Sequence, residues 1–133
     1  MQQAKLNKTV LPSDIAKQKK LFKHRLYQFV LRLIEFLDQL PKDAISAQLS
    51  GHLMESGTRM MSNYIQEGKA PHHFPWSSKL VTESKLWLAL LRDSKRAKAE
   101  EVAWFLWELD EMEAFLAGHA LPTDEKRIGC HFS

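Results

Sequence analysis

Cysteine is nearly absent from this sequence, because its 133 residues include only Cys130. A disulfide within the chain is therefore excluded, which favours a reducing compartment such as the cytoplasm. Long apolar runs are absent as well, since the longest, "LYQFVLRLIEFL", is too short and too charged to span a bilayer. The stretch "MQQAKLNKTVLPSD" has no apolar segment typical of a signal peptide. We expect a cytoplasmic protein with no membrane partner.

Recognisable catalytic motifs are absent too. A di-iron bundle needs Glu-x-x-His pairs, whereas here His52 and Glu55 occur once and in the reverse order. No glycine-rich phosphate loop is present, and the hydroxyls of Ser56, Thr58 and Ser62 have no general base nearby in sequence. Other histidines lie in a proline-rich linker or near Cys130: His72, His73, His119 and His131. The sequence predicts no catalytic residue, no metal and no cofactor, and therefore a protein that is not an enzyme.

Prolines and glycines divide the chain into four segments with the helical period. Ser13 is expected to cap the first helix, which ends before Pro41, and Asp43 is expected to cap the second. Gly68 and Gly118 are expected to end the second and fourth helices, and Ser77 or Ser78 to open the third. No segment alternates as a strand does. We predict an all-α, antiparallel up-down four-helix bundle over 13–119, between a basic N-terminal tail (1–12) and a C-terminal tail (120–133).

Apolar residues recur in each segment every three or four positions, as on a helix that faces a core. The four stripes are Phe22, Leu26, Phe29, Val30, Leu33, Leu37 and Leu40; Ile45, Leu49, Leu53, Met60 and Tyr64; Leu80, Val81, Trp87, Leu88 and Leu91; and Val102, Phe105, Leu106, Leu109, Met112 and Leu116. Further apolar residues lie off the first and fourth stripes: Leu31, Ile34, Phe36, Trp104, Trp107 and Phe115. Either the core contact within one bundle is broad, or a second subunit covers this surplus. We predict a homo-oligomer whose interface includes Leu31, Ile34, Trp104, Trp107 and Phe115.

Charge is unevenly distributed, although the net charge is only +3. Residues 1–25 carry seven lysines and arginines but only one acid, Asp14. A second basic cluster is the stretch "SKRAK" (94–98). In residues 100–113, by contrast, every charged residue is acidic. These runs are either solvated helix faces, or sites for an anionic partner or for pairing between subunits. The candidate nucleic-acid contacts are Lys17, Lys19, Lys20, Lys23, Arg25, Lys95, Arg96 and Lys98. In an antiparallel bundle the two clusters lie at opposite ends. Phe22 and Tyr27 accompany the first cluster, and Phe22 belongs to the core stripe.

One stretch, "ESGTRMMSNYIQEG" (55–68), carries many small and polar residues inside a predicted helix. It is either a catalytic segment or a place where another helix comes unusually close. Small residues permit close packing, so we interpret Ser56, Gly57 and Ser62 as packing positions, and we expect Thr58 and Asn63 to hydrogen-bond across helices.

The same stretch, together with "LPKD" (40–43), resembles the bacterial four-helix-bundle family named after intervening sequences in 23S ribosomal RNA genes. The matching residues are Leu40, Pro41, Lys42, Leu53, Ser56, Gly57, Thr58, Asn63, Tyr64, Glu83, Trp87, Leu88 and Leu91. The family's arginine before Ser-Gly-Thr is Glu55 here, its Ile-Gly is Met60-Met61, its alanine is Ser62, and its later glutamate is Gln66. The resemblance covers about residues 20–117. Within this resemblance, the departures imply a specialised branch of the family.

The resemblance implies a homopentameric ring. It also connects the chain to the accessory variability determinant of diversity-generating retroelements, a basic bundle that assists a reverse transcriptase. The partners implied are other copies of the chain, RNA or DNA bound through repeated basic collars, and a reverse transcriptase. The function we expect is a non-enzymatic accessory or scaffold protein associated with nucleic acid. The alternative is a protein–protein adaptor with no direct nucleic-acid binding.

Overall fold

The computed structural model describes residues 12–67, 75–118 and 121, and within them it has four helices and no strands. The helices are α2 (Pro12–Asp38), α3 (Ala44–Glu67), α4 (Pro75–Asp93) and α5 (Ala99–Leu116). The all-α class predicted from the sequence is confirmed for these residues. The predicted tails and linker lie mostly outside the described residues, and so do His72, His73, His119, Cys130 and His131.

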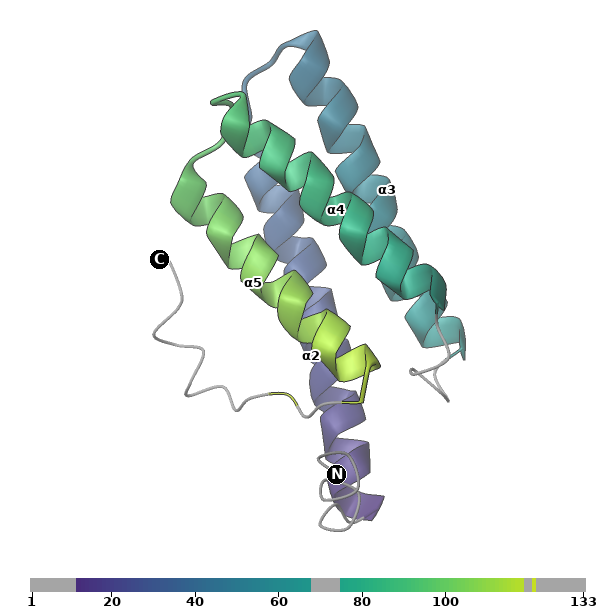
Figure 1. Ribbon diagram of the computed structural model, residues 1–133. Coiled ribbons are helices and arrows are strands. Elements are labelled where there is room, and N and C mark those ends of the chain that lie inside the picture. Colours follow the sequence, from purple (N-terminus) through teal and green to yellow (C-terminus); the bar gives the residue numbers. More distant parts are fainter. Residues whose placement is uncertain (1–11, 68–74, 119–120, 122–133) are drawn as a thin grey trace.

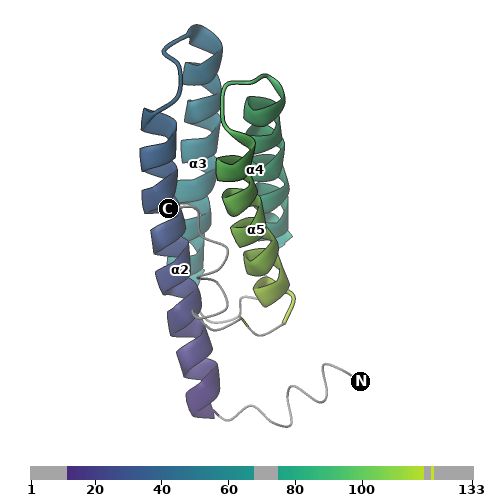
Figure 2. The ribbon, with the colours of Figure 1, turned by 90° about the vertical axis from the view of Figure 1, so that its left-hand side faces the viewer.

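The four helices lie side by side, and each packs against two neighbours (Figure 1). α3 contacts α2 and α4, and α5 contacts α4 and α2. The connection from α2 to α3 and that from α4 to α5 lie at the same end of the molecule (Figure 2). An ion pair between Arg96 Nε and Asp43 Oδ1, 3.4 Å apart, joins these two connections. The N-terminal turns of α2 extend beyond the other three helices at the opposite end (Figures 1 and 2).

The helix ends follow local chemistry. Asp43 caps α3 as predicted, because its Oδ1 accepts a hydrogen bond from the Ser46 backbone N–H at 2.8 Å and its Oδ2 one from the Ser46 hydroxyl at 3.1 Å. These hydrogen bonds, the backbone one first, hold the pKa of Asp43 below its usual value. α2 begins at Pro12, before the predicted cap Ser13, and α4 begins at Pro75, before Ser77. Proline is well suited to a first helical turn, since its missing N–H has no partner there in any helix.

The core is formed by the predicted stripes with four corrections. Phe36 and Trp104, assigned to surplus surface, are 6% exposed and belong to the core. Ile45, assigned to the stripe of α3, is 51% exposed, because the side chain that turns inward beside the Asp43 cap is that of Ser46. Leu121, assigned to a tail, is buried in the core, and its N–H donates to Gln18 Oε1 at 2.8 Å. Each bundle helix meets two neighbours, so its apolar stripe is wider than a single-sided contact requires.

Candidate nucleic-acid interface

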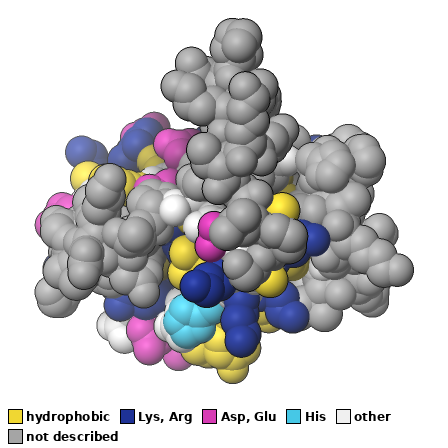
Figure 3. Space-filling model, turned by 90° about the horizontal axis from the view of Figure 1, so that it is seen from below, with side chains coloured by type: hydrophobic (Ala, Val, Ile, Leu, Met, Phe, Trp, Pro, Cys, Tyr) yellow, Lys and Arg dark blue, Asp and Glu magenta, His cyan; other side chains and the backbone are white. Residues whose placement is uncertain are grey.

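The N-terminal half of α2 carries an exposed group of lysines, which we call the basic arm: Lys17, Lys19, Lys20 and Lys23. Lys17, Lys20 and Lys23 are exposed, whereas Lys19 is half-buried and makes a contact. None of the ion pairs found in the described part of the chain involves these three exposed lysines. Seen from the end where α2 begins, Lys and Arg side chains gather around a histidine and a hydrophobic patch (Figure 3). Among the described residues, the three exposed lysines of the arm are therefore not paired with an acid, and the acid that precedes them on α2 is Asp14.

Arg25 does not belong to this exposed surface, although the sequence placed it there. Its side chain is only 2% exposed, and its Nη2 lies 3.2 Å from each carboxylate oxygen of Glu108. The same nitrogen also pairs with Glu111. A buried arginine needs such partners, since an unpaired charge away from water is strongly unfavourable. Arg25 therefore joins α2 to α5 and is not available to a phosphate.

The second basic cluster lies in the connection between α4 and α5, at the other end of the bundle from the arm. Lys95 and Lys98 are exposed, and Arg96 pairs with Asp43. Lys95 has φ 64° and ends α4 in the left-handed conformation, with its N–H bonded to Arg92 O at 3.0 Å and the Arg96 N–H bonded to Leu91 O at 2.9 Å. This double hydrogen bond is a Schellman motif, whose left-handed position is usually occupied by glycine.

Most other cations of the bundle have acidic partners. Lys85 bridges Asp110 at 2.5 Å and Glu113 at 3.2 Å, and although burial works against its charge, these two hydrogen bonds raise its pKa. Arg59 pairs with Glu55 within α3, and Arg92 pairs with the adjacent Asp93. The exposed lysines that enter none of these ion pairs are Lys17, Lys20 and Lys23 of the basic arm, Lys95 and Lys98 between α4 and α5, and the separate Lys42 and Lys79.

The two aromatic residues near the arm have opposite environments. Phe22 is 2% exposed and stacks on Phe115, with ring centroids 4.5 Å apart, as its place on the core stripe predicted. Tyr27 is 52% exposed. It lies one helical turn beyond Lys23, on the outward face of α2.

The small-residue stretch of α3 is a packing segment in part. Ser56 is 5% exposed, and a Cβ added to Gly57 would lie 3.1 Å from Leu33 Cδ2 of α2. At Gly57, α3 therefore lies close to the Leu33 side chain of α2. Ser62 is exposed, so it is not a packing position in this bundle, and Asn63 is half-buried. Thr58 is exposed and donates to Met54 O of its own helix at 2.7 Å, so the interhelical bond predicted for it is wrong.

The five residues predicted for an oligomer interface fall into two groups. Leu31, Ile34 and Trp107 are 40–43% exposed, on the outer sides of α2 and α5. Trp104 is buried, and the guanidinium of Arg32 lies over its ring, 4.8 Å from the centroid. Phe115 is half-buried beneath Phe22. Trp104 was therefore placed at the surface wrongly, because it faces α2 within the same chain.

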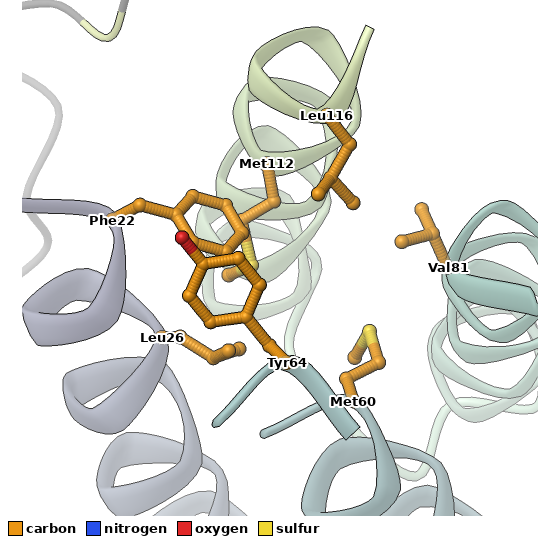
Figure 4. A pocket seen from close by; sticks show the side chains of 7 residues that line it. All are labelled: Phe22, Leu26, Met60, Tyr64, Val81, Met112 and Leu116. Carbon is orange, nitrogen blue, oxygen red and sulfur yellow. The ribbon is translucent and has the colours of Figure 1, made fainter. Parts of the chain in front are cut away.

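A small pocket among the four described helices has no room for an organic ligand. It is lined by apolar side chains from all four helices and by the Tyr64 ring (Figure 4): Phe22, Leu26, Met60, Tyr64, Val81, Met112 and Leu116. Its volume of about 10 Å³ is close to the minimum for a single water molecule.

A shallow depression between α3 and α4 contains part of the small-residue stretch. His52 stacks on Trp87 there, with ring centroids 4.7 Å apart, beside Glu55, Arg59 and Glu83. Across the described ranges, no group of three or more His, Cys, Asp and Glu side chains is arranged to hold a metal ion. Of the helices in those same ranges, none is both long and apolar enough to cross a bilayer.

Comparison with protein-family models, with curated proteins and with solved structures finds no match for this chain.

Proposed function

We propose that this chain is a non-enzymatic accessory or scaffold protein that binds RNA or DNA through its basic ends. The basic arm is the observation that supports this function. Lys17, Lys20 and Lys23 are exposed, none of the ion pairs among the described residues involves them, and they lie in the N-terminal half of α2, whose first turns extend beyond the other helices (Figure 2). A polyanion is the partner that gains most from such a surface, because each phosphate contact releases condensed counterions.

The proposed architecture is an antiparallel up-down bundle that assembles into a homopentameric ring in the cytoplasm. Leu31 and Ile34 on α2 and Trp107 on α5 support self-association, since three large apolar side chains remain exposed on two helices. The number five comes from the resemblance to the ribosomal intervening-sequence family. A ring would repeat both basic ends as separate collars, so weak phosphate contacts would act together. The same resemblance makes a reverse transcriptase a candidate protein partner.

Oligomerisation has a direct test in light scattering at micromolar concentration. We expect a mass several times that of the chain, 15.4 kDa, and a smaller mass for Trp107→Glu. Trp104→Glu is the matched comparison: it should unfold the chain, because Trp104 is buried, whereas Trp107→Glu should leave the helical circular dichroism unchanged. A wild-type mass equal to that of one chain would contradict the ring.

Nucleic-acid binding is tested by fluorescence anisotropy with labelled RNA and DNA between 50 and 200 mM salt. If three lysines neutralise three phosphates, the slope of log K against log salt is about −2 to −3 for each arm. The variant Lys20→Glu/Lys23→Glu should lose most binding. The control Lys42→Glu changes the net charge half as much, at an exposed position in the α2–α3 connection at the other end of the bundle from the arm (Figure 2), and it should retain binding.

A protein–protein adaptor is the second candidate function. The observation that favours it is a pair of exposed leucines on α4, Leu86 at 51% and Leu90 at 42%, which are four residues apart and hence on one helix face. Wild-type protein that binds neither RNA nor DNA at 50 mM salt would overturn the nucleic-acid function in favour of the adaptor.

A further inference from the structure

We infer that Tyr27 is a stacking platform for an unpaired nucleobase, so that the basic arm selects single-stranded over duplex nucleic acid. This inference rests on the proposed function, because it assigns a ligand class to the same surface.

The first step is the exposure of the Tyr27 ring. Aromatic rings are normally buried, and the other tyrosine, Tyr64, is 3% exposed. The ring of Tyr27 is 52% exposed, and it takes part in none of the ring contacts found among the described residues. A large flat surface is therefore open to solvent on the outer side of α2.

The second step is the position of Tyr27 relative to the arm. Lys20, Lys23 and His24 precede it by seven, four and three residues, so all four side chains lie on one face of the helix. Helical side chains lean toward the N-terminus, which directs the ring over the turn that carries Lys23 and His24. A strand whose phosphates follow the lysines would therefore bring a base to the ring about one helical turn away, roughly 5–6 Å along the axis.

The third step is the chemistry of stacking. A base in a duplex has both faces covered by its neighbours, whereas an unpaired base can place one face on an aromatic side chain. Stacking of this kind is sequence-tolerant, since every base has a π-face. The arm would thus bind phosphates of any nucleic acid, and Tyr27 would add affinity only for a single strand.

Charge complementarity separates Tyr27 from the other large aromatic residue exposed on the described surface, Trp107. Trp107 is 41% exposed, but Asp110 and Glu111 follow it by three and four residues on the same side of α5. Glu111 pairs with Arg25 and Asp110 with Lys85, and α5 itself carries no lysine or arginine that could hold a phosphate chain beside Trp107. Leu31 and Ile34 follow Tyr27 by four and seven residues on the same outer face of α2. Tyr27 therefore lies where the basic part of this face ends and its apolar part begins.

The experiment compares Tyr27→Ala, Tyr27→Phe and Trp107→Ala with wild type. The probes are a labelled oligo-dT, a labelled oligo-U and a labelled DNA duplex of equal length, measured by anisotropy at several salt concentrations. We expect Tyr27→Ala to weaken binding of both single strands about 5- to 150-fold, which corresponds to the 1–3 kcal/mol typical of one stacked base. For Tyr27→Ala, duplex binding and the salt slope should stay unchanged, and Tyr27→Phe should retain the wild-type preference for single strands. Trp107→Ala changes the proposed interface between copies and hence the overall affinity, but it should leave the ratio of single-strand to duplex binding unchanged.

Three results would overturn the inference. Tyr27→Ala could leave single-strand binding unchanged, it could weaken duplex and single-strand binding equally, or it could alter the mass in light scattering, which would assign Tyr27 to an interface between copies. In each case salt-dependent binding by the wild type would leave the proposed function standing. Absence of any wild-type binding at low salt would remove both.

Discussion

Two glycines of α3 offer a matched test of the close approach between α2 and α3. A Cβ added at Gly57 would lie 3.1 Å from Leu33 Cδ2 and 4.0 Å from Val30 Cγ2, whereas a Cβ added at Gly51 would meet nothing within 4 Å. Both glycines lie inside α3, where Gly51 is exposed and Gly57 is buried. The variants Gly51→Ala and Gly57→Ala therefore share their effect on helix propensity and differ in packing.

The expected magnitudes follow from these contacts. Replacing glycine by alanine inside a helix raises the free energy of unfolding by about 1 kcal/mol, and this gain applies at both positions. At Gly57 the new methyl presses on Leu33, which is fully buried and has little room to move. Overpacking of this kind costs about 1–3 kcal/mol. Gly51→Ala should thus stabilise the protein by about 1 kcal/mol, and Gly57→Ala should lie about 1–3 kcal/mol below it.

Urea denaturation followed by helical circular dichroism measures both variants, and the slopes of the two transitions should agree with wild type. In thermal melts the two midpoints should differ by about 4 °C for each kcal/mol. If Gly57→Ala stabilises the protein as much as Gly51→Ala does, then Leu33 moves aside freely and the reasoning about close packing is wrong.

Three further predictions concern the bundle. Arg25→Met should lower the free energy of unfolding, measured in urea, by about 3–5 kcal/mol, because buried Glu108 loses its cation. The double variant Arg25→Met/Glu108→Leu should recover most of this loss. If the double variant loses as much stability as the two single variants added together, the two side chains do not form a buried pair. Lys95→Gly should raise the free energy of unfolding by about 1 kcal/mol, because the left-handed backbone at φ 64° is unfavourable for a residue with a side chain and not for glycine. An unchanged urea midpoint would contradict this. Burial raises the pKa of Tyr64 above its ordinary value of 10.0, so its contribution to stability is complete below pH 10.0 and is lost as pH rises through the higher folded value. In Tyr27→Phe, where Tyr64 is the only tyrosine, the phenolate absorbance should appear above pH 10.0, and titration at the ordinary value would refute its burial.

Helix positions and most of the core could be predicted from the sequence, because both depend on a repeat that each segment carries by itself. Phe22, Leu26, Phe29 and Leu33 follow one another at steps of three and four, and all are buried. The cap at Asp43 was predictable for the same reason, since its partner Ser46 is three residues away. Local spacing determines these features, whatever the rest of the fold does.

The buried ion pair could not be predicted in this way, because its two halves are far apart in sequence. Arg25 and Glu108 are each ordinary helix residues until α2 and α5 meet. One signal was nevertheless present: Arg25 lies three residues after Phe22 and four before Phe29, inside the buried stripe. Trp104 was misplaced for a related reason, because a helix that packs on two neighbours buries residues on both sides of its main stripe. Exposed Tyr27 was equally unpredictable, since only packing decides which aromatic residue remains outside.

The contact of Arg25 with Glu108 and Glu111 also limits how the helices can be aligned along one another. If α5 slid by one turn relative to α2, the guanidinium would keep only one of its two carboxylates and would face Trp104 or Phe115 in place of the other. Apolar side chains alone tolerate such slippage, because one leucine can substitute for another against a flat apolar neighbour. A single cation between carboxylates on two successive turns of α5 therefore favours the one alignment in which both are within reach. It disfavours the shifted bundles that the otherwise uniform leucine and phenylalanine stripes would permit.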